Sequence, residues 1–151
     1  LDTLKAPFAY AFKPNERQAD ALYRPELSPQ EINDPFTLFG REWTPIPLIH
    51  GRFTVLGFRI GNFAYCTDCN LIPAASQALL QNLDVLIIDA LRPRPHPTHL
   101  SFEQALAMIE TLKPRRAFFT HLSHDMKHKD IEATLPPHVH VGYDTLKIDV
   151  P

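Results

Sequence analysis

Cysteine is scarce in this sequence: Cys66 and Cys69 are the only two among 151 residues. Their scarcity argues against a disulfide scaffold and suits the reducing cytoplasm, where we expect the protein to reside. A single Cys-x-x-Cys with no second pair is also a weak indication of a zinc or redox site. We therefore expect both thiols to be small buried side chains on either side of Asp68.

Long apolar runs and an excess of positive charge are missing as well. No stretch approaches the roughly 18 apolar residues that span a bilayer, and residues 1–5 do not resemble a signal peptide. The formal net charge is −2 and no basic patch is evident, which argues against a membrane or nucleic-acid partner. With 44% hydrophobic residues, the chain has the composition of a globular domain.

Proline and histidine, by contrast, are abundant. The chain has fifteen prolines and eight histidines, and the histidines gather in the later part of the sequence. Because imidazole is a common metal ligand, this distribution suggests a metal site.

Residues 1–35 carry weak structural signals. Phe8, Tyr10 and Phe12 alternate with small residues as in a half-buried strand, and residues 24–34 have the composition of a loop. We expect an irregular, flap-like segment that ends at residue 35.

The pattern is clearer over residues 36–151. A strand over 43–49 is expected at a sheet edge because Pro45 and Pro47 cannot donate to a neighbouring strand. Further strands are predicted over 53–60, 63–67, 84–89, 116–120, 139–141 and 146–150, and helices over 74–83, 102–112 and 127–135. Ser101 is the expected N-cap of the second helix. The order predicts an α/β (α+β) domain with a mixed sheet covered by helices.

Four residues of ligand type lie at or shortly after predicted strands. They are His50, Asp68, His99 and His121. Their imidazole nitrogens and carboxylate oxygens suit zinc, manganese or iron. Taken singly, each is also explained as a cap or a solvated polar group beside a turn.

The densest histidine cluster runs from His121 to His128. His124 and His128 are four residues apart and would share one face of a helix, where they could bind a metal. The alternative is that His124 caps the helix and His128 is solvated. His138 and His140 are expected at the surface.

Several motifs together resemble the second half of the metallo-β-lactamase-fold hydrolases. They are Pro-Leu-Ile-His-Gly at 47–51, Leu-Gly-Phe-Arg-Ile at 56–60, Ala-Tyr-Cys-Thr-Asp at 64–68 and Phe-Thr-His-Leu-Ser-His at 119–124. The loop at 94–101 resembles that of one branch, the phosphoribosyl cyclic phosphate phosphodiesterases. The resemblance implies that residues 36–151 form the C-terminal half of an αββα sandwich.

This resemblance also implies roles for individual residues. His50 matches the ligand of one metal, Asp68 the aspartate that bridges two metals, and His121 the ligand of the second. His99 matches a histidine near the scissile phosphate and is the expected general acid. His124 matches a ligand of an accessory zinc, but the cysteines that share that zinc are absent from this chain. The implied cofactors are two divalent ions, zinc or manganese.

One family motif is missing: the chain contains no His-x-His-x-Asp-His. We therefore expect a fragment of a binuclear phosphodiesterase that acts on a small phosphodiester and is inactive alone. Its partner would be the N-terminal half of the fold or a second chain. The alternatives are another substrate on the same fold, as in tRNA 3′-end nucleases or lactonases, and a non-catalytic half-domain that binds a metal or a partner chain.

Overall fold

The computed structural model describes residues 5–12, 27–124 and 127–150, and it divides into two compact units, Leu1–Asn33 and Asp34–Pro151. In the first unit, a short 3-10 helix, η1 (Ala9–Ala11), takes the place of the expected half-buried strand. Phe8 and Tyr10 are about half exposed, because the turn sends their side chains away from buried Ala11. Residues 1–4 and 13–26 of the expected flap lie outside the described residues, and residues 27–35 form no helix or strand.

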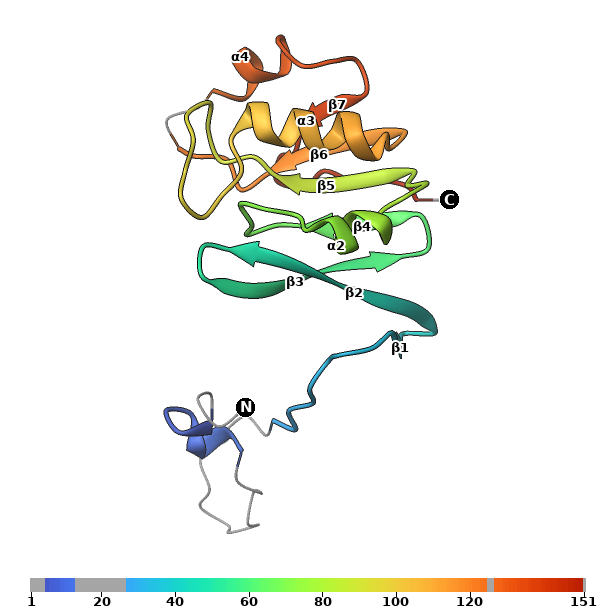
Figure 1. The fold of residues 1–151 in the computed structure, drawn as a ribbon, viewed down its shortest axis with the longest axis vertical. Helices are drawn as coiled ribbons and strands as arrows, with labels where there is room; N and C mark the ends of the chain where they lie inside the picture. Colours follow the sequence, from blue (N-terminus) through green and yellow to red (C-terminus); the bar gives the residue numbers. More distant parts are fainter. Residues whose placement is uncertain (1–4, 13–26, 125–126, 151) are drawn as a thin grey trace. The chain divides into compact units, whose positions relative to one another are not determined.

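The described part of the second unit forms one seven-stranded sheet (Figure 1). Its strands, which are neighbours in chain order, are β1 (Phe36–Leu38), β2 (Arg41–His50), β3 (Phe53–Ile60), β4 (Phe63–Cys66), β5 (Val85–Asp89), β6 (Arg116–Thr120) and β7 (Val139–Val141). Strands β1 to β4 pair antiparallel, and β4 to β7 pair parallel. As a result, β2, β4, β5 and β6 all point the same way and end at the same edge of the sheet.

The proline-rich part of β2 has a strand on one side only. β1 pairs with residues 41–43 alone, so Pro45 and Pro47 pair with β3 and have no strand opposite. The Ser76 hydroxyl donates to the Pro47 carbonyl on that open side. The prediction of an edge strand is therefore right at the two prolines. It is wrong at Trp43, because Trp43 is also paired with β1.

The helices match the prediction unevenly. Helix α3 (Phe102–Leu112) has the expected bounds, and Ser101 and Gln104 form a capping box at its start. Helix α2 (Ala74–Ala78) is shorter than the expected 74–83, and Asn82 beyond it has a left-handed backbone (φ 57°). Helix α4 (His128–Glu132) is likewise shorter than 127–135.

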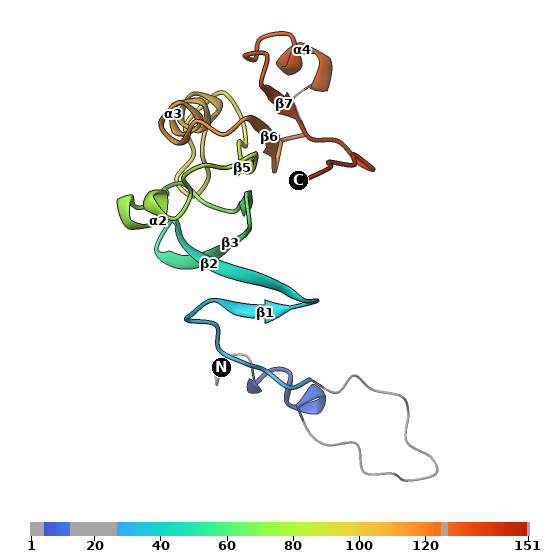
Figure 2. The same cartoon turned by 90° about the vertical axis from the view of Figure 1, so that its right-hand side faces the viewer.

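Helices α2 and α3 cover one face of the sheet, as Figure 2 shows. Side chains on this face are fully buried and form the core together with Ile109 and Leu112 of α3: Ile46, Leu48, Ala64, Cys66, Leu86, Ile88 and Phe119. The expectation of buried free cysteines is confirmed for Cys66 and Cys69. Burial raises the pKa of Cys66 to about 12, so its thiol stays protonated at neutral pH.

The opposite face of the sheet is less covered. Cross-strand neighbours there are Leu56, Phe58, Tyr65, Ile87 and Phe118; of these, Leu56 and Tyr65 are exposed and only Phe118 is buried. The C-terminal segment forms no strand over 146–150, contrary to expectation. Leu146 and Ile148 instead line a cavity together with Tyr65, Ile87 and Phe118. None of the helices in the described residues is long and apolar enough to cross a membrane.

Candidate metal centre

The candidate site forms where the parallel strands end. His50 is the last residue of β2, Asp68 follows β4 by two residues, and His121 directly follows β6. His99 lies in the loop between β5 and α3, and Asp89 is the last residue of β5. Residues distant in sequence meet here because β2, β4, β5 and β6 share one direction.

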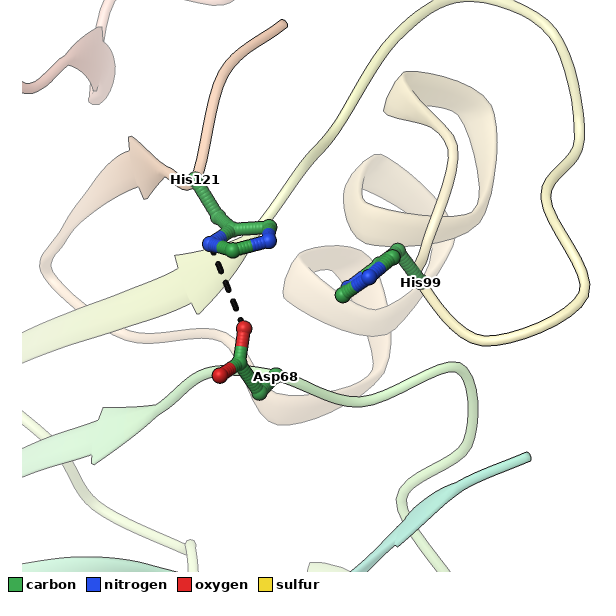
Figure 3. A group of neighbouring side chains, drawn as sticks. All are labelled: Asp68, His99 and His121. Atoms are coloured by element: carbon green, nitrogen blue, oxygen red, sulfur yellow. Dashed lines mark ion pairs between the residues drawn. The ribbon is translucent and has the colours of Figure 1, made fainter. Parts of the chain in front are cut away.

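Three of these side chains converge on one point (Figure 3). Asp68, His99 and His121 each offer one ligand atom, and these atoms all lie within 4.8 Å of one another. Asp68 Oδ1 is 3.2 Å from His121 Nδ1. One carboxylate oxygen and two imidazole nitrogens are suitable ligands for zinc, manganese or iron.

The backbone is strained at both predicted ligands in this group. Asp68 has φ 59° and His121 has φ 62°, in the left-handed region that non-glycine residues rarely adopt. Each such residue costs on the order of 1 kcal/mol, and strain of this kind gathers at functional sites. The left-handed turn directs each side chain away from the course of its strand, toward the common point seen in Figure 3.

His50 lies beside this group but is not part of it. Its Nδ1 is 2.9 Å from the carbonyl oxygen of Thr98, so Nδ1 donates this bond and Nε2 is the nitrogen left for a ligand. Metal-binding histidines are commonly oriented by such a bond. The His50 ring centre is 4.8 Å from that of His99. The structure therefore brings two of the predicted ligands, Asp68 and His121, together with His99. It places the third predicted ligand, His50, next to His99.

The turn after His50 is held firmly against the loop that carries His99. Gly51 has φ 63°, and a Cβ at this position would lie 2.9 Å from Thr98 Cγ2. The Gly51 amide also donates to Asn70 Oδ1 at 2.8 Å. The left-handed backbone and the close approach to Thr98 both favour glycine here, so the turn after His50 packs directly on the loop that carries His99.

His99 occupies the middle of a row of imidazole rings. Its ring centre is 4.5 Å from that of His121 and 5.0 Å from that of His96. Its side chain is 13% exposed, and Nδ1 lies 3.0 Å from Asp89 Oδ2. Because a carboxylate can only accept, Nδ1 donates this bond and Nε2 remains available.

Asp89 is a site residue that the motif analysis missed. Its side chain is 0% exposed, and Oδ2 accepts from both His99 Nδ1 and the Cys69 amide, the latter at 2.9 Å. Burial raises the pKa of Asp89, and these two hydrogen bonds partly oppose the rise. The sequence feature that could have identified Asp89 is its position, since it is an acidic residue at the carboxyl end of the apolar run 85–88.

The remaining histidines lie outside the group of three. His124 is exposed and does not cap α4, whose N-cap is Lys127, so the expected helical pair with His128 does not form. His128 Nε2 is 3.2 Å from the Val141 carbonyl oxygen. His138 is exposed as expected. His140 is at the surface only in part, because its side chain is 38% exposed while its ring lies on Phe118 and contacts Glu132.

Known proteins share the fold that carries this site. A family model described as the beta-lactamase superfamily domain matches residues 1–122. The chain belongs to the beta-lactamase superfamily. A superfamily member of known structure, a diphosphatase from the PhnP family, is 34% identical with a TM-score of 0.85. That match covers 99% of this chain and 55% of the diphosphatase chain.

Two further matches are with a much longer protein and with a structure that shares the fold alone. An octanoyltransferase of Porphyromonas gingivalis (strain ATCC BAA-308 / W83) is 33% identical over 149 residues, which are 97% of this chain and 30% of that protein. Zinc-bound PqqB from Methylobacterium extorquens is 16% identical with a TM-score of 0.63, over 83% of this chain and 56% of that one. The chain thus spans about half of these solved structures and under a third of the octanoyltransferase.

These similarities confirm the expected fold and family. The mixed sheet with helices on one face is the predicted metallo-β-lactamase architecture, and the likeness to the PhnP-family diphosphatase agrees with the predicted branch. The name octanoyltransferase belongs to a protein that lies mostly outside the matched region. It therefore does not decide what the shared part does.

Proposed function

We propose that this superfamily member is the C-terminal part of a hydrolase that cleaves a small phosphodiester with two divalent ions, zinc or manganese. The observation that carries the proposal is the convergence of Asp68, His99 and His121 within 4.8 Å. Its support from relatives is the 34% identity to a diphosphatase of the PhnP family.

The residues present fit such ions. His50 and Asp68 would hold one ion, and Asp68 and His121 the other, with further ligands supplied from outside this chain. When bound, two such ions lower the pKa of a bound water and neutralise phosphoryl oxygens. The strained backbones of Asp68 and His121 and the oriented ring of His50 are consistent with ligand roles.

His99 is the proposed general acid. During hydrolysis, a water molecule loses a proton to solvent and its oxygen bonds to phosphorus, the P–O bond to the leaving group breaks, and His99 gives a proton to the departing oxygen. Solvent then returns a proton to His99. Its Nδ1 donates to Asp89, so the transferable proton is the one on Nε2. A leaving alkoxide needs this proton because it is a strong base.

The partner of the chain is proposed to be the missing half of the fold, on the same protein or on another chain. The sheet face opposite α2 and α3 presents Leu56, Tyr65 and Ile87, which are exposed or half-buried. An apolar face of this kind is suited to a second sheet. The site lies at the sheet edge, so the second half could reach it with additional ligands.

The test is metal content and phosphodiesterase activity of the complete gene product, supplied with zinc or manganese. We expect Asp68→Ala and His121→Ala to lose bound metal and at least about 100-fold in turnover of bis(p-nitrophenyl) phosphate. His138→Ala, an exposed histidine outside the group, is the matched control. A metal-loaded wild-type protein that cleaves no phosphodiester would overturn the proposal.

A further inference from the structure

Asp89 is the fully buried carboxylate at the end of β5. We propose that Asp89 is a positioning residue that holds His99 and the loop of Asp68 in their reactive places. This inference rests on the proposed function, because it concerns the acid and a metal ligand of that reaction. It adds a residue that touches neither the metal nor the phosphodiester.

The first contact fixes the ring of His99. Asp89 Oδ2 accepts from His99 Nδ1 at 3.0 Å, and the carboxylate is completely buried while the imidazole is 13% exposed. An unbonded imidazole can place either nitrogen toward the site and can carry its proton on either one. The bond to Asp89 selects the form in which Nδ1 is protonated, so that Nε2 is the nitrogen left for the site.

The second contact fixes the backbone next to Asp68. The same oxygen, Oδ2, accepts from the Cys69 amide at 2.9 Å. This amide belongs to the peptide that follows Asp68, whose backbone is left-handed at φ 59°. Loss of the acceptor would free that peptide to relax toward an ordinary conformation, and the Asp68 carboxylate would move with it.

The choice of a carboxylate at this position also supports a role in the reaction. Burying a carboxylate costs folding free energy, because the group loses its hydrogen bonds to water and gains too few partners in the protein. Its second oxygen, Oδ1, is buried and has no hydrogen-bond partner among the described residues. A charged acceptor also holds the His99 N–H and the Cys69 amide in place more firmly than a neutral acceptor would.

Two substrates separate positioning of the acid from a general structural role. Bis(p-nitrophenyl) phosphate has a weakly basic leaving group that departs without a proton, whereas a dialkyl phosphodiester needs one. In the complete gene product, we expect Asp89→Asn to lower kcat for the dialkyl ester by about 10- to 100-fold. The neutral asparagine oxygen holds the His99 ring less firmly than the carboxylate does, which affects only the ester that needs an acid. We expect kcat for the aryl ester to change by less than about threefold, because the asparagine oxygen can still accept from Cys69.

Further variants complete the test. Asp89→Ala removes both bonds, so we expect loss of metal as well as of turnover on both substrates. His99→Ala should show the same preference for the aryl ester as Asp89→Asn, and the double variant should lose little more than His99→Ala alone. Asp84→Asn is the matched control, since Asp84 precedes the other end of β5 and pairs with exposed Arg115.

Nitrogen NMR of His99 gives a readout that does not depend on turnover. In the metal-free wild-type protein we expect Nδ1 to be the protonated nitrogen, and in Asp89→Ala a mixture of both forms. Equal losses on both substrates in Asp89→Asn, or unchanged kinetics and His99 spectra, would overturn the inference. A wild type that cleaves neither ester would defeat the proposed function instead, while metal content and NMR would still decide whether Asp89 holds both groups.

Discussion

Two kinds of restraint act on individual residues of the candidate site. Asp68 and His121 are restrained by left-handed backbones, whereas His50 and His99 are restrained by hydrogen bonds from Nδ1 to Thr98 and Asp89. Both restraints fix the positions of these side chains before any ion or substrate is present. Such preorganisation lowers the cost of binding a metal and of reaching the transition state.

The role of His99 can be decided by a single substitution. His99→Ala in the complete gene product should lower turnover of a dialkyl phosphodiester by about 10²- to 10³-fold while metal content stays unchanged, because a general acid is lost and the ligands remain. Turnover and bound metal should be measured on the same preparation. This distinction matters because His99 also lies within 4.8 Å of both Asp68 and His121.

His96→Ala is the control for this prediction. His96 stacks on His99 at 5.0 Å and accepts a bond from Thr98, but it is not part of the converging group. A loss of metal equal to the loss of turnover in His99→Ala would make His99 a ligand. Unchanged turnover would show that His99 is an ordinary loop residue without a catalytic role.

At the scale of elements, a carboxylate connects α4 to β7. Glu132 Oε2 accepts from the Val141 amide at 2.6 Å, and Oε1 is 3.1 Å from His140 Nδ1. Burial alone would raise the pKa of Glu132, but the bonds from Val141 and His140 lower it below the ordinary value. The ionised form of Glu132 is therefore the one that the fold stabilises.

This connection predicts a pH-dependent stability. A carboxyl group with a lowered pKa in the folded state stabilises the fold above its unfolded value of about 4.3, and the contribution disappears as the pH falls through the folded value. Glu132→Gln should therefore cost about 1 kcal/mol at pH 7, reduced by partial exposure, and almost nothing once the pH lies below the folded-state pKa of Glu132. Urea unfolding at both pH values measures the difference.

Glu110→Gln is the matched control, because Glu110 is exposed on α3. It should leave the unfolding midpoint unchanged at both pH values. A cost for Glu132→Gln that persists at low pH would show that its packing, and not its charge, connects α4 to β7.

At the scale of the whole molecule, the described residues leave one face of the sheet incompletely covered, and the proposed ligand set is small. With His50, Asp68 and His121 as ligands and Asp68 shared, each ion would have two protein ligands. Catalytic zinc normally has three. Exposed apolar side chains such as Leu56 and Tyr65 on the open face favour association with another surface.

These features predict the behaviour of residues 1–151 expressed by themselves. We expect the chain to bind metal weakly, to show no phosphodiesterase activity, and to be poorly soluble or to associate. A longer version that includes a His-x-His-x-Asp-His motif should be soluble and active at the same metal concentration. Comparable activity from the two versions, assayed side by side, would show that the motif is not required.

Much of the local structure could be predicted from the sequence because it depends on neighbouring residues. The capping box of Ser101 and Gln104 and the apolar period of residues 102–112 determined α3, and the alternation over 53–60 determined β3. The candidate residues His50, Asp68, His99 and His121 were found at strand ends, but their roles came from resemblance. The shortness of α2 was not evident, since good helix formers continue beyond Ala78.

The tertiary structure alone decided how the site residues meet. Asp89 and His99 are separated by a proline-rich loop, and their bond forms because that loop folds back over the end of β5. The left-handed backbones of Asp68 and His121 had no local cue, because neither residue is a glycine. Local sequence determines which elements form, whereas the shared direction of β2, β4, β5 and β6 determines which side chains converge, and that direction results from long-range pairing.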